Sequence, residues 1–233
     1  LTTGNYNTAF GSNALVHNTT SDENTAIGRS AMHQLTTGSL NTAVGYRALH
    51  DITTGIKNAV IGNIACHKVT TGNRNAVVGY EALQTCTTGS NNTAIGNSAL
   101  YYLTTAGENT AIGKGAGSNL TTGTGNVCLG AAAQVSAADG SYANVIGFNV
   151  SGEGGYTTIG TSGSDIRAAN GVATWATELK KILQIQQQVY LLLMTLDLEH
   201  LTLKLKAIYL KNLAVTKKAL QKHTKTIKQI MVL

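Results

Sequence analysis

The sequence predicts an all-β repeat fold, a parallel β-solenoid that is followed by a helical C-terminal segment. Three observations support this prediction: a seventeen-residue phrase that recurs along the chain, a short alternating strand pattern inside each phrase, and a change of composition near residue 170. Of the 233 residues only 12% are charged, 26 are Gly and none is Pro. Low charge with enrichment in Gly, Thr, Asn and Ala indicates a regular backbone stack rather than a conventional globular core.

The repeat has a fixed period. Residues 35–51, LTTGSLNTAVGYRALHD, are followed by ITTGIKNAVIGNIACHK, which keeps the same pattern. Seventeen residues cannot bury a core alone, but stacked coils share one. A Gly closes a central pentad in nine units, and an Asn opens that pentad in the first eight of them. The Gly recurs every seventeen residues at Gly11, Gly28, Gly45, Gly62, Gly79, Gly96, Gly113, Gly130 and Gly147.

Each pentad predicts a short strand. The letters NTAIG at 24–28 are bounded by turn formers, and the "SAL" element predicts a second short strand. Alternation puts Thr25 and Ile27 on one face and Ala26 on the other. We expect the Ile/Val/Phe column to fill the interior, the Ala column to form a flat outer face, and the Asn column to form amide ladders. The interior column is Phe10, Ile27, Val44, Ile61, Val78, Ile95, Ile112 and Leu129, and the Ala column is Ala9, Ala26, Ala43, Ala94 and Ala111.

The pentad resembles the "SVAIG" core of the left-handed parallel β-rolls in trimeric autotransporter adhesin heads. The full phrase TTGxxNTAIGxxAL is similar to the repeats of phage and other viral tail fibres, over about residues 1–160. The resemblance implies a left-handed parallel β-roll that forms a homotrimer, with small residues lining the contact between the three rolls. The adhesin heads use a shorter repeat, which favours the viral type.

The chain divides into a β-roll fibre domain (1–160), a junction (161–171) and a basic tail (172–233). Residues 1–170 hold 7 Lys and Arg against 8 Asp and Glu, a net charge of −1, whereas residues 171–233 hold 10 Lys against 3 acids, a net charge of +7. Leu1 falls within a repeat unit, so we expect the chain to be the C-terminal part of a longer protein or a trimmed product.

The tail predicts a coiled coil. Ile182, Val189, Leu196, Leu203 and Leu210 fall in one heptad column, and a trimeric coiled coil suits a trimeric rod. Residues 196–210 alternate like a strand, which keeps a β alternative open. The basic charge comes without an aromatic or motif signature of nucleic-acid binding, and no apolar run is long enough to span a membrane.

The junction TSGSDIRAAN resembles the "SDxRLK" start of the self-cleaving intramolecular chaperone that follows many phage fibres. Ser164, Asp165 and Arg167 match, and the resemblance implies Ser164 as the nucleophile. Ala168 and Ala169 stand where that family has Leu-Lys, so the assisting Lys is absent. Because a serine needs a nearby base to be activated, we expect no self-cleavage and no other catalysis.

Two further sequence features, a Gly-rich run and the three cysteines, are explained by the repeat. The run GKGAGSN at 113–119 has the wrong spacing for a phosphate-binding loop. Cys66, Cys86 and Cys128 replace apolar residues in three different columns, which predicts buried free thiols and neither a disulfide nor a cofactor.

His33, His50 and His67 are spaced by seventeen residues and therefore share one column. Neutral imidazoles stacked at strand spacing would be able to bind a transition metal. The alternative is a polar outer column that Gln84 and Tyr101 continue.

The residue pairs before each Asn and after each Gly change from unit to unit. Positions that vary on a repeat scaffold are exposed turns, where recognition residues lie. Tyr46, Arg47, Arg74 and Tyr80 are the candidates for contact with a sugar or protein, against the alternative that they are solvated turn residues.

These features predict a structural and host-receptor-binding segment of a viral, phage-like tail fibre. Its expected partners are two further copies of itself and a host cell-surface glycan or protein, with no nucleic acid, no membrane insertion and no cofactor. Its expected location is the virion, in a tail or capsid fibre. The alternatives are a trimeric adhesin head at the bacterial surface and a Thr-rich ice-binding solenoid.

Overall fold

The computed structural model describes residues 3–169, 184–188, 210–214, 216–218 and 221. The chain forms two units, Leu1–Val172 and Ala173–Leu233. The first is an all-β parallel solenoid of about nine turns, as the sequence predicts. The described residues of the second unit, 184–188, 210–214, 216–218 and 221, are helical, and the rest of the predicted helical tail lies outside the described residues.

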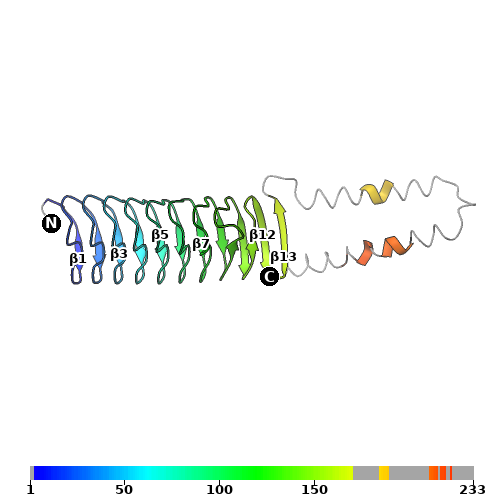
Figure 1. The fold of residues 1–233 in the computed structure, drawn as a ribbon, viewed down its shortest axis with the longest axis horizontal. Helices are drawn as coiled ribbons and strands as arrows, with labels where there is room; N and C mark the ends of the chain where they lie inside the picture. The colour runs from blue at the N-terminus through cyan, green and yellow to red at the C-terminus, as the bar shows by residue number, and fades with distance from the viewer. Residues whose placement is uncertain (1–2, 170–183, 189–209, 215, 219–220, 222–233) are drawn as a thin grey trace, which may run out of the picture. The chain divides into compact units, whose positions relative to one another are not determined.

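The solenoid consists of short strands that recur with the period of the sequence (Figure 1). Eight three-residue strands come first, and their register pairs each residue with the one seventeen positions later. The strands are β1 Thr8–Phe10, β2 Thr25–Ile27, β3 Thr42–Val44, β4 Ala59–Ile61, β5 Ala76–Val78, β6 Thr93–Ile95, β7 Thr110–Ile112, β8 Val127–Leu129, β9 Gln134–Val135, β10 Asn144–Phe148, β11 Ser151–Gly152, β12 Tyr156–Thr161 and β13 Ser164–Ala169.

One eleven-stranded sheet runs along the unit in the order β1 to β8, then β10, β12 and β13. All its neighbours are parallel except the last pair, because β13 turns back and lies antiparallel to β12. Figure 1 shows the coils stacked one after another, with β13 at the end of the row. A second, two-stranded sheet joins β9 and β11.

The interior lies on the opposite face of the strands from the one we expected. In β2 to β8 the central residue of the strand is buried, and the Ile/Val/Phe column points outward. In the described part of the chain, Ala26, Ala43, Ala94 and Ala111 are fully buried inside the roll, while Ala9 in β1 is exposed. The Ala column is therefore not available to line a contact between copies.

The strands bury their small residues rather than their large ones because the other walls of each coil already place bulky side chains in the interior. Large residues from the "AL" element and from the position before Thr-Thr-Gly already fill the narrow interior, so the strand has room only for Ala, Val or Cys. A Cβ on Gly117 would lie 2.9 Å from Leu100 Cδ2 and 3.5 Å from both Cys128 Sγ and Leu120 Cδ1, so these walls meet there. The bulky columns are Leu15, Met32, Leu49, Cys66, Leu83 and Leu100, and Leu35, Ile52, Val69, Cys86, Leu103 and Leu120.

The outward residues form an apolar row that we call the Ile/Val stripe. Most of its members are exposed, as with Ile61 at 49% and Val78 at 44%. The neighbouring outward column consists of Thr, Ala, Val and Asn, so this face of the strands carries no charge. The stripe consists of Phe10, Ile27, Val44, Ile61, Val78, Ile95, Ile112, Leu129, Ile146 and Ile159.

The "SAL" element was predicted to be a strand and forms turns instead in units one to seven. These turns require a left-handed backbone at the second residue after the pentad Gly and again at the "AL" Leu, as in Arg47 with φ 54° and Leu49 with φ 50°. Inter-coil hydrogen bonds persist without a regular strand, since Leu49 N donates to Ala65 O at 3.1 Å. Only the last coils hold strands at this corner, β9 and β11.

The pentad Gly is required by close approach. Gly79 has φ +145°, and a Cβ there would lie 2.3 Å from the carbonyl oxygen of Gly96 in the next coil.

The Asn column forms the predicted ladder: Asn75 donates from N and Nδ2 to Asn58 Oδ1 at 3.0 Å, and Nδ2 also donates to Gly89 O at 3.0 Å. Among the described residues no helix is long and apolar enough to cross a membrane.

Candidate functional site

The variable turns lie at the two ends of each strand and hold their side chains at fixed positions. The second residue of the pair before Asn is left-handed, as in Lys57 with φ 60° and Arg74 with φ 54°. These turns also stack by hydrogen bonds, since Arg74 N donates to Ile56 O at 3.0 Å. The backbone repeats while the side chains differ, so the fold presents different residues on one constant support.

Tyr46 and Arg47 lie in the turn that follows β3. The guanidinium carbon of Arg47 lies 5.2 Å from the centroid of the Tyr46 ring, and that of Arg29, one coil earlier, lies 5.8 Å from it. Both arginines are exposed and Tyr46 is half-buried. Cation–π contact holds the two charges beside the ring, so the three side chains form one cationic, aromatic group.

Tyr80 and Arg74 do not join this group. Tyr80 lies in the same column as Tyr46 but two coils further along, and the two residues make equivalent bonds, since Ile64 N donates to Tyr46 O and Ser98 N donates to Tyr80 O. A hydrogen bond with Glu81 raises the pKa of the exposed Tyr80 phenol. Arg74 precedes β5 whereas Tyr80 follows it, so these two residues lie at opposite ends of that strand.

The histidine column forms as predicted. The rings of His33 and His50 stack with centroids 5.0 Å apart and an interplanar angle of 5°, and those of His50 and His67 stack at 5.0 Å and 4°. His17 adds an edge contact to His33 at 4.8 Å. Backbone hydrogen bonds fix the spacing, since Gln34 N donates to His50 O and Asp51 N donates to His67 O, both at 3.0 Å.

Asp51 links two of these rings. Its Oδ1 lies 2.6 Å from His50 Nδ1, and its Oδ2 lies 3.9 Å from His67 Nδ1. One ligand atom from each of the three residues lies within 4.8 Å of the other two, and all three side chains are half-buried. His33 stacks on His50 but does not belong to this group of potential ligands, and its Nδ1 is buried without a hydrogen-bond partner.

The environment favours neutral imidazoles at two positions. Burial lowers the pKa of His33, and the neighbouring His50 and His17 lower it further. Burial also lowers the pKa of His67, against the opposing attraction of Asp51. Neutral imidazole is the form that binds metal ions.

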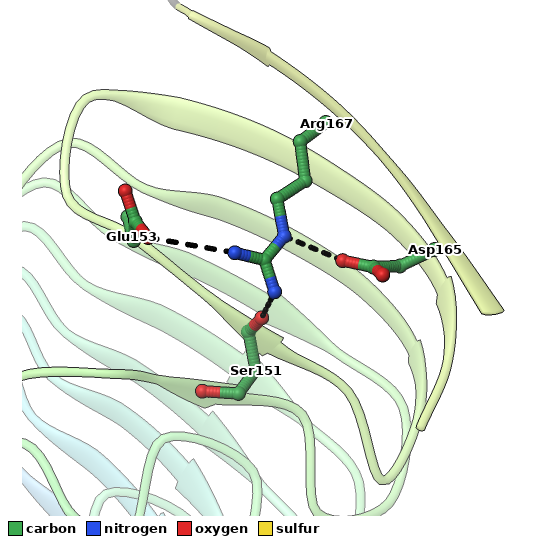
Figure 2. A network of polar contacts seen from close by, with 4 residues as sticks. All are labelled: Ser151, Glu153, Asp165 and Arg167. Atoms are coloured by element: carbon green, nitrogen blue, oxygen red, sulfur yellow. Dashed lines mark hydrogen bonds and ion pairs between the residues drawn. The ribbon is translucent and has the colours of Figure 1, made fainter. Parts of the chain in front are cut away.

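The predicted self-cleavage serine lies at the start of β13. Ser164 is exposed and its backbone is paired with Thr161 of β12. Arg167, from the same motif, belongs to a surface network (Figure 2): its Nε donates to Asp165 Oδ2 at 2.5 Å, Nη1 to Glu153 at 3.5 Å and Nη2 to Ser151 O at 3.3 Å. The contacts of Arg167 with Ser151 and Glu153 thus tie β13 to β11 and to the residue that follows it.

The glycines of GKGAGSN serve the backbone. Gly115 (φ 65°) and Gly117 (φ 58°) occupy the two left-handed turn positions that Ser98 and Leu100 occupy one coil earlier.

All three cysteines are buried and free, as predicted. Burial raises the pKa of the Cys86 thiol to about 11 and that of Cys128 to about 12.

Sequence reasoning missed two contributors. Arg29 was not among the predicted recognition residues, although its seventeen-residue spacing from Tyr46 places it in the same column. Asp51 was not considered as a ligand, although it directly follows His50. Both signals were present once the columns were aligned, because neighbours across coils are separated by one period.

No known protein family, curated protein sequence or solved structure matches this chain. The candidate sites therefore stand on their geometry and on the repeat.

Proposed function

We propose that this chain is a structural and host-receptor-binding segment of a viral, phage-like tail fibre, located in the virion. One observation carries the proposal: buried columns and inter-coil hydrogen bonds are constant from coil to coil, whereas the exposed turn side chains differ. A regular stack with variable turns suits a protein that displays recognition residues at fixed spacing. The resemblance of the phrase to tail-fibre repeats supports the same function.

In this proposal the chain acts as a homotrimer whose copies pack through the Ile/Val stripe. A long apolar row on an uncharged face is a feature of interaction surfaces rather than of isolated chains. The stripe has the same period in every copy, so copies aligned in register place apolar side chains against each other in every coil. The Ala column, buried in each roll, has no part in the contact.

Light scattering on the purified chain tests this assembly. We expect a native mass about three times the chain mass of 24.2 kDa. Replacing Ile61 and Ile95 by Lys puts charges into the stripe two coils apart and should give monomers. The matched control is Thr54→Lys with Thr88→Lys, two exposed corner residues at the same separation, which should leave the mass unchanged. A monomeric parent chain, or an equal effect of both pairs, contradicts the assembly.

Receptor contact is assigned first to the group of Arg29, Tyr46 and Arg47. Two guanidinium groups beside an aromatic ring offer paired hydrogen-bond donors to carboxylate or sulfate and an apolar surface to a sugar or side chain. The partner in this proposal is therefore a host cell-surface glycan or protein with acidic groups.

An array of neutral and acidic glycans, together with intact cells from a panel of hosts, tests receptor binding. We expect Arg47→Gln to reduce retention at least tenfold, and Lys114→Gln, which removes another exposed turn cation, to change it less than twofold. Absence of retention on every glycan and cell type overturns the receptor-binding part, and equal losses in the two variants overturn the assignment to this group.

One observation favours a second function, ice binding. In β2, β3, β6 and β7 the outward residues are Thr followed by Ile or Val, which places hydroxyl and methyl groups side by side on this face, with Ala in place of Thr in β4 and β5. If the chain is monomeric, this face meets water, and thermal hysteresis of the chain in solution measures whether it binds ice. A trimer without hysteresis supports the fibre instead.

A further inference from the structure

We propose that His50, Asp51 and His67 form a binding site for one divalent transition-metal ion of the zinc class, which clips two consecutive coils together. The site is independent of the fibre proposal, because it requires only the fold of the single chain.

The ligand types point to this class of ion. Two imidazole nitrogens and one carboxylate oxygen are a set that Zn²⁺ and neighbouring divalent ions use when one or more coordination positions stay open to water. All three side chains are half-buried, so an ion reaches the site from solvent and can retain water ligands. Mg²⁺ and Ca²⁺ prefer sites made wholly of oxygen ligands and fit this one poorly.

The distances require only a small adjustment. The three ligand atoms lie within 4.8 Å of one another, with the His50–Asp51 pair at 2.6 Å. Around a tetrahedral zinc with bonds of about 2.0–2.2 Å, neighbouring ligand atoms lie about 3.3 Å apart. The His50–Asp51 pair must open by less than about an ångström, and a pair of ligand atoms at the 4.8 Å limit must close by about 1.5 Å. Half-exposed side chains can make these changes by rotating about their χ angles.

The fold fixes the relative position of the ligands. His50 and Asp51 end one coil and His67 ends the next, and the backbone hydrogen bond from Asp51 N to His67 O, 3.0 Å long, holds the two coils in register at this point. The parallel ring planes of His50 and His67 are set by the same register. The two imidazoles are thus held beside each other before an ion arrives, which reduces the ordering that binding requires.

Asp51 supplies the charge that makes the site suitable for a cation. Arg47 and Lys68 lie near enough to His67 to disfavour its protonation, and they oppose a bound cation in the same way. The carboxylate of Asp51, in contact with both rings, offsets them locally. Removing its charge should therefore weaken metal binding as much as removing an imidazole.

Isothermal titration of the full chain with ZnCl₂, at slightly alkaline pH where imidazoles are neutral, tests the proposal. We expect one Zn²⁺ per chain and an increase of the unfolding temperature on binding, since the ion binds only the folded register. MgCl₂ and CaCl₂ should give neither effect. Absence of zinc binding, or equally strong binding of Mg²⁺, overturns the proposal.

Single substitutions identify the ligands. His67→Gln and Asp51→Asn should each weaken zinc binding at least tenfold. The control His17→Gln changes an exposed histidine that contacts His33 by its ring edge but lies outside the column. The double control His200→Gln with His223→Gln changes the two histidines that lie outside the described residues, and both controls should keep the parent affinity. Each variant should give the same far-ultraviolet circular dichroism spectrum as the parent chain, which shows that its fold is kept.

Two results would overturn the assignment of ligands. If His33→Gln weakens zinc binding as much as His67→Gln does, the ion is held by the stacked rings of His33 and His50 rather than with Asp51. If His67→Gln retains the parent affinity while the tail double control loses it, the ion binds in the tail.

Discussion

At the scale of single residues, the Asn column satisfies every hydrogen-bonding group of its buried amides. Asn75 uses both hydrogens of Nδ2, toward Asn58 and Gly89, and its Oδ1 accepts from N and Nδ2 of Asn92. A buried polar group that is fully bonded stabilises a unique arrangement, whereas one left unpaired costs about 1–3 kcal/mol. Asn is the side chain of this size that offers two donors and an acceptor in one plane.

Asn75→Ala should therefore lower the free energy of unfolding by more than about 2 kcal/mol, because it leaves Asn92 N and the Gly89 carbonyl without their partners. Urea denaturation followed by circular dichroism measures this. Asn97→Ala, at an exposed position, should change it by less than about 0.5 kcal/mol. Similar effects of the two substitutions would show that the ladder contributes little.

The buried thiols make stability depend on pH in the alkaline range. The folded-state pKa of each cysteine is raised above its ordinary value of 9.0, to about 11 for Cys86 and about 12 for Cys128, because burial disfavours the thiolate. The unfolded chain releases these protons above pH 9 while the folded chain keeps them, so the stabilisation is complete below pH 9 and is lost as pH rises toward 11–12.

We expect the urea midpoint to fall between pH 9 and pH 11, over the range between the ordinary and folded-state values. The triple variant Cys66→Leu, Cys86→Val, Cys128→Ala uses residues from the same columns and should show a flatter pH dependence. Native thiols should also react with an alkylating reagent far more slowly than unfolded ones. Rapid alkylation of the folded chain would contradict the burial of the thiols.

At the scale of elements, the strand positions and their seventeen-residue register follow from the sequence, but the buried face does not. Alternation divides a three-residue strand into one residue on one face and two on the other, and hydrophobicity alone favours Ile27 rather than Ala26 as the interior residue. The choice depends on how much of the interior the other walls fill, and the columns of Leu49 and Ile52 leave space for a small residue only. Such a volume balance is a property of the whole coil.

The candidate sites were predictable to a similar degree. Columns are a direct consequence of the period, so the stacking of His33, His50 and His67 followed from their spacing. The contact of Asp51 with two rings did not, because it depends on where the turn directs adjacent side chains. The prediction of a second strand at "SAL" was wrong for a related reason. Hydrogen bonds between coils form there, but the backbone includes left-handed residues, which a strand pattern does not contain.

Ile64 is poorly suited to the left-handed turn position that it occupies after the pentad Gly62. Its φ is 59°, and a β-branched side chain in this region is strained. Ile64→Asn should raise the free energy of unfolding by about 1 kcal/mol, because Asn tolerates the left-handed region. Val16→Asn, which changes an exposed β-branched residue whose φ is not positive, is the control and should not stabilise the chain. A gain in urea midpoint for both would attribute the effect to polarity rather than to backbone strain.

At the scale of the whole solenoid unit, each coil interacts mainly with its two neighbours. Strands pair in sequence from β1 to β8, and the Asn column and the pentad Gly column continue through them without a break. The stability of such a stack is approximately a sum of coil terms and contacts between adjacent coils. The period, rather than the identity of any one coil, is therefore the condition for folding.

Deletion of one complete period tests this condition. Removing residues 75–91 joins Arg74 to Asn92 and leaves every column in register, since Asn92 then takes the place of Asn75 above Asn58. The shortened chain should keep the parent circular dichroism spectrum per residue and lose only part of its stability.

Removing residues 75–82 deletes fewer residues but moves the following pentads out of their columns. Buried Asn and Leu side chains would then face turns, and the close Gly contacts would fall on residues that carry a Cβ. We expect this shorter deletion to abolish the cooperative urea transition of the first unit while the longer one preserves it. Equal tolerance of the two deletions would mean that local strand propensity, and not the shared register of the columns, holds the coils together.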